Sequence, residues 1–377
     1  MKVLITGGAG FIGSHVALSL LGKGYEVTIL DSLSEQIHGC EPQKTSPLFR
    51  SIGKDAEFIN GDVRDRCAWE RSLKGVDYVI HLAAETGTGQ SMYEIQKYVD
   101  TNIGGTALLL DILTNARHSV RRVVVAESRA IYGEGKYHCP QCGDVYPLGR
   151  RDQDMQNGDF ECHCPRCGGA IQLVATTEDS LLHPSSVYGI AKQVQGQLVH
   201  LVCQSIGMES VSFRYQNVYG PGQSLNNPYT GILSIFSTRI RNGKGLNIFE
   251  DGKESRDFVY IDDVVNATIL GMERTEAAGH AFNIGTGLPT DVMTVARMLC
   301  TAYGHDVPLT ISGNYRLGDI RHNYADISLA RKLLGFEPKW KFDRGVAEFA
   351  KWVEGQSSPV DNYEASIAEM KAKGLYK

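Results

Sequence analysis

The chain has 377 residues, which exceeds a typical single domain and predicts either one large domain or two interlocked ones. Hydrophobic residues at 42% and charged residues at 21% are typical of a globular protein with a sizeable core. The formal net charge of −5, with no basic run, argues against nonspecific nucleic-acid binding as the main function. We expect a cytoplasmic protein with no membrane partner, because the first strand begins at Lys2 and no apolar run reaches spanning length.

The first 31 residues predict a strand, a glycine-rich turn, a helix and a second strand that ends on an acid. In chain order these are residues 2–6, the turn from Gly7 through Gly10 to Gly13, residues 14–21, residues 27–30 and Asp31. Glycines allow the backbone to turn sharply and to approach a pyrophosphate, which the N–H groups of a helix N-terminus bind. Asp31, 18 positions after Gly13, is placed to accept hydrogen bonds from an adenosine ribose and to repel a 2′-phosphate. The sequence therefore predicts an NAD site rather than an NADP site.

Strands and helices continue to alternate after this unit. Further strands are expected at residues 57–60, 76–84, 122–126 and 211–215, with a helical pattern at residues 92–115 that Gly104 and Gly105 interrupt. This order predicts an α/β fold with a doubly wound parallel sheet of the Rossmann type. Ligands of such sheets bind beyond the carboxyl ends of the strands. The residues at those ends are Gly7 to Gly13, Asp62, Val63, Ala83 to Thr86, Ser128, Gln216 and Asn217.

The alternation divides the chain into three regions. They are a Rossmann domain at residues 1–134 and 179–217, an inserted zinc ribbon at residues 135–178, and a smaller substrate lobe at residues 218–377. Within that lobe, residues 258–285 are expected to return to the sheet, because a helical pattern there is followed by a strand-like run. Residues 363–377 form either a short amphipathic helix, with Ile367 and Met370 on one face, or a frayed tail.

A tyrosine can act as the base in hydride transfer from an alcohol carbon if a nearby cation lowers its pKa. The motif Tyr-x-x-x-Lys occurs three times, at Tyr93 and Lys97, at Tyr132 and Lys136, and at Tyr188 and Lys192. The second pair encloses two glycines, which are poor helix formers, and the first has no evident partner. The third opens a helix after the N-cap sequence Pro184-Ser-Ser186, and Ser128 follows a strand end. We predict a catalytic set of Ser128, Tyr188 and Lys192.

Five of the nine cysteines crowd into residues 139–167. Two Cys-x-x-Cys pairs supply four expected metal ligands, which are Cys139, Cys142, Cys164 and Cys167. A separation of 21 residues between the pairs is typical of a structural zinc ribbon in a reducing compartment. Cys162 and His163 are spare candidates. Because Ser128 and Tyr188 flank this insertion, we expect it near the active-site mouth, where it shapes substrate entry or an oligomer contact.

Together these motifs resemble the extended short-chain dehydrogenase/reductase family of nucleotide-sugar epimerases and dehydratases. The matching segments are the Gly7–Gly13 turn, Asp62-Val63, residues 81–84, Asn102, Ser128 with Tyr188 and Lys192, residues 214–221, residues 251–263 and residues 316–319. They cover nearly the whole chain apart from the cysteine-rich stretch.

The resemblance implies a tightly bound NAD, a nucleotide-sugar substrate and a homodimer built from the helices after Met92 and Ser186. The implied cofactor residues are Gly7, Gly10, Phe11, Ile12, Gly13, Asp31, Asp62, Val63, Ala83, Ala84, Asn102, Tyr188 and Lys192. The implied substrate residues are Glu85, Thr86, Ser128, Asn217, Arg256, Arg316 and Asp319. Of these, Asn217 and the two arginines are expected to hold the nucleotide diphosphate.

Within the resembling family, this chain best matches the 4-epimerases. The 4,6-dehydratases carry an Asp-Glu pair where this chain has Arg129 and Ala130, and the reductases use NADP, which Asp31 disfavours. Residues 83–91 and the cysteine-rich insertion resemble bacterial dTDP-L-rhamnose 4-epimerases, which make dTDP-6-deoxy-L-talose. A 4-epimerase of the UDP-glucose or UDP-N-acetylglucosamine type is the alternative substrate class. An NAD-sensing regulator with a zinc ribbon is the alternative of another kind.

Overall fold

Seven parallel strands form the central sheet of the computed structural model, which describes residues 1–377 except 54, 226, 228–230 and 357–360. In chain order they are β1 (Lys2–Thr6), β2 (Glu26–Asp31), β3 (Glu57–Asn60), β4 (Tyr78–His81), β5 (Arg122–Ser128), β9 (Glu209–Tyr215) and β13 (Ala281–Ile284). Their order across the sheet is β13-β9-β5-β4-β1-β2-β3, and every pairing is parallel. The strand order reverses between β1 and β4, which is where a doubly wound sheet binds its ligands. The predicted Rossmann-like α/β fold is confirmed.

Helices cover both faces of this sheet because its strands are apolar on both sides. Val3 and Ile5 pack with α1 (Phe11–Gly22) and α12 (Ile261–Glu273), whereas Leu4 packs with the helices of the opposite face. Those helices are α5 (Arg66–Ser72), α8 (Gly105–Asn115) and α10 (Val187–Ser205). Shorter helical segments are α2 (Glu35–His38), α3 (Pro42–Thr45), α4 (Pro47–Ile52), α6 (Thr88–Ser91), α7 (Ile95–Tyr98) and the 3₁₀ turns Arg129–Tyr132 and Thr275–Ala277.

The two glycines expected to interrupt the helix before β5 do not break it. A π-helical turn, Val99–Gly104, joins α7 directly to α8, which begins at Gly105. A Cβ atom at Gly105 would lie 2.7 Å from Cγ2 of Val63. The glycine therefore serves the close approach of the helix to the loop after β3, rather than a break in the helix.

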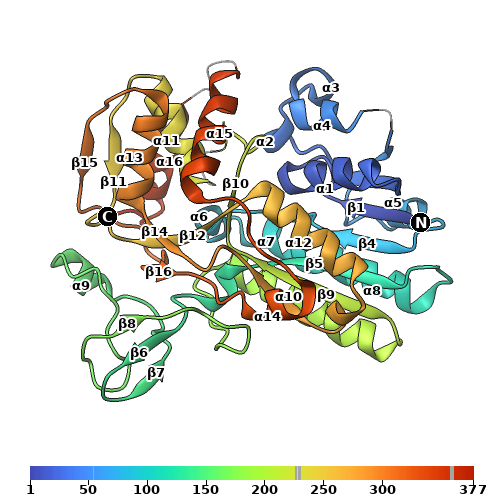
Figure 1. Ribbon diagram of the computed structural model, residues 1–377, viewed down its shortest axis with the longest axis horizontal. Coiled ribbons are helices and arrows are strands. Elements are labelled where there is room, and N and C mark those ends of the chain that lie inside the picture. Colours follow the sequence, from blue (N-terminus) through green and yellow to red (C-terminus); the bar gives the residue numbers. More distant parts are fainter. Residues whose placement is uncertain (54, 226, 228–230, 357–360) are drawn as a thin grey trace.

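The smaller lobe follows β9 and shares its core with the α1 face of the sheet (Figure 1). Its strands are β10 (Asn217–Tyr219), β11 (Leu246–Ile248), β12 (Ser255–Tyr260), β14 (Pro289–Asp291), β15 (Leu309–Ile311) and β16 (His322–Asn323). Its helices are α11 (Ile232–Arg241), α13 (Val292–Tyr303), α14 (Ser328–Leu334), α15 (Phe342–Glu354) and α16 (Tyr363–Ala372). Helix α12 and strand β13 return to the large sheet and α14 packs against β13, whereas β12 pairs with β10 in the lobe. The C-terminal residues form a helix, with Ile367 and Met370 buried, and not a frayed tail.

The cysteine-rich insertion, residues 135–178, projects beside the smaller lobe at the lower left of Figure 1. It contains a three-stranded antiparallel sheet of β6 (Tyr137–Cys139), β7 (Gly143–Val145) and β8 (Gln172–Leu173), together with α9 (Asp152–Gln156). A small apolar cluster of its own includes Tyr137 and Val145. In the part of the chain that is described, no helix is long and apolar enough to cross a membrane.

Candidate active site

A cavity of about 1240 Å³ lies beyond the carboxyl ends of the sheet strands, between the sheet and the smaller lobe. It exceeds the roughly 300–1,000 Å³ of a typical small-molecule site, so there is room for two ligands. The predicted site residues that line it are Gly7, Gly10, Phe11, Ile12, Gly13, Asp31, Asp62, Val63, Ala83, Ala84, Glu85, Thr86, Ser128, Tyr188, Asn217, Arg256, Arg316 and Asp319. We call the side formed by Gly7 to Ala84 the cofactor wall, and the side formed by Asn217, Arg256, Arg316 and Asp319 the substrate wall.

The glycine turn of the cofactor wall leaves no room for a side chain. A Cβ atom at Gly13 would lie 2.2 Å from the carbonyl oxygen of Gly7. At Gly7, whose φ is 67°, a Cβ atom would lie 2.8 Å from the amide nitrogen of Ala83. Helix α1 starts at Phe11 without a side-chain cap at Gly10, so the N–H groups of its first turn are free to bind an anion. These features fit the pyrophosphate of NAD.

Asp31 ends β2 at the far end of the cofactor wall. Its carboxylate accepts hydrogen bonds from the amide N–H groups of Ala9, at 3.0 Å, and Leu33, at 2.8 Å. The nearby His38 ring lies 3.9 Å from this carboxylate, and burial lowers the pKa of His38 although Asp31 opposes that shift. The ring is therefore neutral near pH 7 and adds no positive charge for a 2′-phosphate. This arrangement fits NAD better than NADP.

The predicted catalytic hydroxyl groups meet where the two walls join. Tyr188 lies in the first turn of α10, whose N-cap is Ser186, with its Oγ accepting from the N–H of Gly189 at 3.1 Å. The amide of Tyr188 also donates to the Ser91 hydroxyl oxygen at 3.1 Å. Burial raises the pKa of Tyr188, whereas its hydrogen bond with Ser128 opposes the rise. The Ser128 and Tyr188 hydroxyl groups are thus hydrogen-bond partners, and both residues line the cavity.

Two predicted cofactor residues lie behind the cavity wall. The Asn102 side chain accepts from the Glu85 N–H at 2.7 Å and donates to the Glu85 carbonyl oxygen at 3.1 Å. The Lys192 ammonium donates to the Ala126 carbonyl oxygen at 2.9 Å, and burial lowers the pKa of Lys192 to about 7. Both side chains therefore hold strand-end backbone in place here, and their contact with the cofactor stays a prediction.

The two rejected Tyr-x-x-x-Lys motifs serve other contacts. The Tyr132 hydroxyl group is buried and donates to the Asn283 side-chain oxygen at 2.8 Å. Lys97 lies 3.0 Å from a carboxylate oxygen of Glu94 and 3.4 Å from one of Glu85. Of the three motif tyrosines, Tyr188 is the one that lines the cavity.

Arg129 is a cavity residue that the sequence did not mark as part of the site. It follows Ser128, and its Nε donates to the Asn217 side-chain oxygen at 3.1 Å. Its charge opposes the raised pKa of Tyr188, after the larger effect of Ser128. Burial, with the nearby charge of Arg256, lowers the pKa of Arg129 to about 9. Its place directly after a catalytic hydroxyl residue was the available signal.

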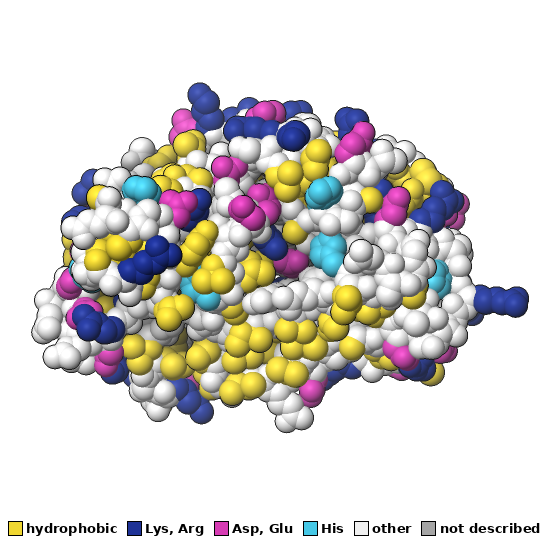
Figure 2. Space-filling view, turned by 90° about the horizontal axis from the view of Figure 1, so that it is seen from below, with side chains coloured by type: hydrophobic (Ala, Val, Ile, Leu, Met, Phe, Trp, Pro, Cys, Tyr) yellow, Lys and Arg dark blue, Asp and Glu magenta, His cyan; other side chains and the backbone are white. Residues whose placement is uncertain are grey.

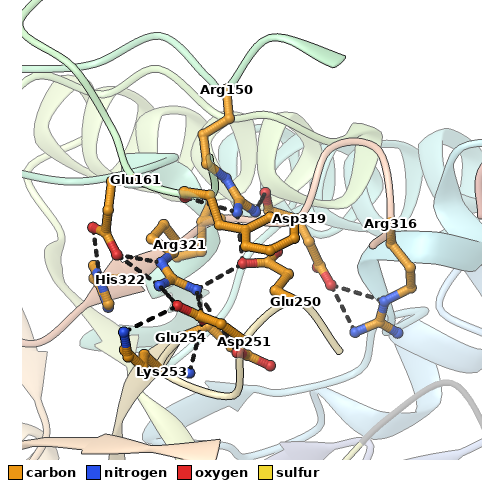
Figure 3. Close-up of polar contacts among 12 residues, drawn as sticks. Arg150, Glu161, Glu250, Asp251, Lys253, Glu254, Arg316, Asp319, Arg321 and His322 are labelled. Carbon is orange, nitrogen blue, oxygen red and sulfur yellow. Dashed lines mark hydrogen bonds and ion pairs between the residues drawn. The ribbon is translucent and has the colours of Figure 1, made fainter. Parts of the chain in front are cut away.

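On the substrate wall, the guanidinium group of Arg316 lies beside the carboxylate of Asp319 (Figure 3). Arg316 forms a two-bond ion pair with Asp319, at 2.7 and 2.8 Å. Arg256 donates to the backbone carbonyl oxygens of Ile320, at 2.6 Å, and Arg321, at 2.8 Å. Two guanidinium groups held in fixed positions match the charge and the oxygens of a diphosphate.

The four predicted zinc ligands converge outside the cavity. Their Sγ atoms all lie within 4.8 Å of one another, and those of Cys139 and Cys167 are 3.7 Å apart. A tetrahedral site with Zn–S bonds of about 2.3 Å has S···S edges of about 3.8 Å. Gly143 and Gly168, each with a φ of 73°, follow the two Cys-x-x-Cys pairs in the same way. The spare candidate His163 instead pairs with an aspartate, at 2.8 Å, and Cys162 is not in the group.

Comparison with known proteins assigns the chain to a family. The model of the NAD dependent epimerase/dehydratase family matches residues 3–150 and 165–285, and the gap between these two segments falls inside the insertion. The dTDP-L-rhamnose 4-epimerase of Burkholderia thailandensis is 36% identical over 93% of this chain and 94% of its own length. A putative UDP-glucose 4-epimerase of Methanocaldococcus jannaschii is 28% identical over 94% of this chain and 99% of its own.

Solved structures agree over nearly the whole chain. The UDP-glucose 4-epimerase of Thermotoga maritima, crystallised with UDP-glucose, has a TM-score of 0.76 at 30% identity, covering 94% of this chain and 99% of its own. The UDP-glucuronic acid 4-epimerase of Bacillus cereus, in complex with UDP-glucuronic acid and NAD, has a TM-score of 0.77 at 26% identity, with the same coverage. With its glycine cradle, its paired hydroxyl groups and these relatives, the chain belongs to the NAD-dependent epimerase/dehydratase family.

Proposed function

We propose that this protein is an NAD-dependent nucleotide-sugar 4-epimerase that interconverts dTDP-L-rhamnose and dTDP-6-deoxy-L-talose through a 4-keto intermediate. The observation that carries the proposal is the position of Ser128 and Tyr188, where the cofactor wall meets the arginines of the substrate wall. The sugar ring, between its diphosphate and the bound NAD, would lie at these hydroxyl groups. The family match and the intact catalytic set favour an enzyme over an NAD-sensing regulator.

The residues of the site have separable roles in this reaction. NAD bound along the cofactor wall would supply the acceptor and the donor for the C4 hydride, which would return to the opposite face of the sugar. The Tyr188 oxygen removes the O4 proton and gives it back, and the Ser128 hydroxyl group bonds the same oxygen. Arg256 and Arg316 hold the diphosphate throughout, so the keto sugar can rotate while it stays tethered.

Sequence identity supports the deoxysugar over a UDP-hexose. The relative with 36% identity is a dTDP-L-rhamnose 4-epimerase, whereas the UDP-glucose 4-epimerases compared above are 28% and 30% identical. Separately, Arg129 and Ala130 stand where the dehydratases carry an acid pair, which favours epimerisation over water elimination. UDP-hexose epimerisation stays the alternative.

We also propose a structural zinc in the insertion, held by the four cysteines. Four thiolates fill a tetrahedral coordination sphere, so this metal has no open position for catalysis. Its binding would stabilise a region whose own apolar cluster is small. Measuring the zinc content of the purified protein tests this proposal. We expect bound zinc in the wild type and its loss in a Cys164→Ser variant.

A homodimer is proposed through the helices before β5 and after Ser186. Helix α7 and the adjoining π turn expose Ile95 and Val99, and α10 exposes Ile190 and Leu201. Figure 2, which views the molecule from below, shows hydrophobic side chains gathered in a broad band, and α10 lies on this lower side in Figure 1. Exposed apolar surface of this kind is typical of an interface. Light scattering tests this proposal. We expect the mass of a dimer for the wild type and the mass of a monomer for a Leu201→Glu variant.

The function is tested by incubating the purified protein, without added cofactor, with dTDP-L-rhamnose and separately with UDP-glucose. Proton NMR of the anomeric signals follows the sugars. We expect a talose configuration to form from dTDP-L-rhamnose alone. Turnover of UDP-glucose alone would discard the deoxysugar assignment and keep the reaction class, and no turnover of either would refute the proposed substrates.

A further inference from the structure

Arg150 is a buried side chain of the insertion that extends to the substrate wall (Figure 3). Its guanidinium group donates to a Glu250 carboxylate oxygen at 2.7 Å and to the Asp319 carbonyl oxygen at 2.9 Å. It also donates to the carbonyl oxygen of Phe160, at 3.2 Å, within the insertion. Only 2% of the Arg150 side chain is exposed. Glu250 and Asp319 both line the cavity, so Arg150 joins the insertion to the substrate wall from behind.

Glu161 forms a second connection, through Arg321. One Glu161 carboxylate oxygen accepts from two nitrogens of Arg321, at 2.6 and 3.0 Å. The Arg321 side chain is fully buried and also pairs with Glu250, at 2.9 Å, and Asp251, at 2.7 Å. Because a buried guanidinium group needs its partners to stay in place, these ion pairs fix the position of Arg321 closely.

Both connections end on residues 319–321, and this segment holds the two arginines proposed to bind the diphosphate. The Asp319 side chain pairs with Arg316, and the carbonyl oxygens of Ile320 and Arg321 accept from Arg256. A single residue therefore separates the insertion from each guanidinium group. Asp319 lies between Arg150 and Arg316. Arg321 lies between Glu161 and Arg256. Buried ion pairs that only stabilise a fold need not end on cavity residues, whereas these two end on the segment that orients the substrate wall.

We infer that Arg150 and Glu161 are positioning residues for the nucleotide diphosphate: they fix residues 319–321, and through them the guanidinium groups of Arg256 and Arg316. They touch neither the sugar nor NAD. The inference rests on the proposed function for the identity of the ligand. Its consequence is that the insertion governs nucleotide-sugar affinity and leaves the chemical step and NAD binding unchanged.

Arg151 and Asp144, both in the insertion, provide matched controls. The Arg151 side chain is 80% exposed and pairs with Asp154, within the insertion, at 2.7 Å. The Asp144 side chain is 51% exposed and pairs with Lys136, also within the insertion, at 2.8 Å. Both controls have the charge of the positioning residues, and these ion pairs stay within the insertion. Replacing them changes the charge of the insertion without changing the connection.

The test compares Arg150→Met and Glu161→Gln with Arg151→Met and Asp144→Asn. Steady-state kinetics with dTDP-L-rhamnose, calorimetric titration with dTDP and with UDP, and NAD content are measured on full-length protein. We expect KM and the dTDP dissociation constant to rise about 3- to 30-fold in the first two variants, the range for residues that act through a packed network. We expect kcat and NAD content to stay within about twofold, and the controls to match the wild type.

Arg150 is buried, so its variant is first checked for a native circular dichroism spectrum. If it does not fold, Glu161→Gln decides, because the Glu161 side chain is 54% exposed. Unchanged KM and dTDP affinity in the folded variants overturns the inference, as does a fall in kcat without a change in KM. A wild type that binds dTDP without turnover refutes the proposed substrate and leaves dTDP affinity to decide the inference. A wild type that binds neither dTDP nor UDP overturns the inference too.

Discussion

The cofactor wall and the substrate wall enclose one cavity but are built in different ways. The core of the cofactor wall comes from 31 consecutive residues, and its geometry depends on backbone approach, as at Gly7 and Gly13. The substrate wall comes from separate segments that charged side chains hold together, such as Arg150 with Glu250 and Arg321 with Glu161. Close backbone packing tolerates no added atom, whereas an ion-pair network can be weakened in steps. Damage to the cofactor wall should weaken binding sharply, whereas damage to the substrate wall should weaken binding in smaller steps.

The largest effect is expected where the walls meet. Tyr188→Phe removes the proposed base and should lower kcat by about 10²- to 10⁴-fold, while NAD stays bound. Turnover is measured by NMR and NAD content after dialysis by absorbance. Tyr93→Phe, from a rejected motif, is the control and should retain activity. Loss of NAD with loss of turnover would mean that Tyr188 supports the cofactor wall rather than the chemistry.

Gly13→Ala tests the cofactor wall. The new methyl group would lie 2.2 Å from the Gly7 carbonyl oxygen, and such overpacking costs about 1–3 kcal/mol, or roughly 5- to 150-fold in NAD affinity. Gly22→Ala, at the end of the same helix with no atom within 4 Å, is the matched control. NAD binding is measured by calorimetry on stripped protein. Equal affinity in both variants would contradict the cradle.

Cys139→Ser tests whether the insertion acts on the substrate wall alone. Loss of one thiolate should release the metal and loosen the insertion, raising KM about 3- to 30-fold with NAD content unchanged. Metal content, NAD content and KM are measured on one preparation. Cys67→Ser, at an exposed cysteine outside the insertion, is the control. A variant that loses NAD as well would show that the walls are not independent.

The smallest effect concerns acid stability. The hydrogen bond to His322, with the charge of Arg321, lowers the pKa of Glu161 to about 2, below its ordinary value. Its stabilisation is therefore present above about pH 4.3 and is lost as pH falls toward 2. Because Glu161 is half exposed, the effect is small. The difference in Tm between wild type and Glu161→Gln should be largest near pH 7 and should shrink progressively as the pH falls from about 4 toward 2. A difference that does not change with pH would contradict this.

The fold and the cofactor wall could be predicted from sequence because their signals are local. The Gly7–Gly13 turn and Asp31 belong to one strand–helix–strand unit, and each strand end points to the same edge of the sheet. The prediction that Gly104 and Gly105 interrupt the helix was wrong. Gly105 is needed for the close approach of the helix to Val63, and the sequence does not show this tertiary contact.

The network behind the substrate wall could not be predicted in this way. Glu250 is 100 residues from Arg150 and 71 from Arg321, and no periodicity connects residues so far apart in the chain. Arg129 was visible as a departure from a family pattern, but its contact with Asn217 depends on the pairing of β5 with β9, which sets Ser128 beside Tyr215. The direction of a side chain could not be predicted from the sequence either. Asn102 and Lys192 both hydrogen-bond to backbone behind the cavity wall.

The most direct test of the account follows the hydrogen at C4. Wild-type protein is incubated in ordinary water with dTDP-L-rhamnose that carries deuterium at C4, and the product is analysed by NMR and mass spectrometry. If the C4 hydride leaves for bound NAD and returns to the same carbon, the dTDP-6-deoxy-L-talose will retain the deuterium at C4. A talose product that carries solvent hydrogen at C4 would contradict the mechanism.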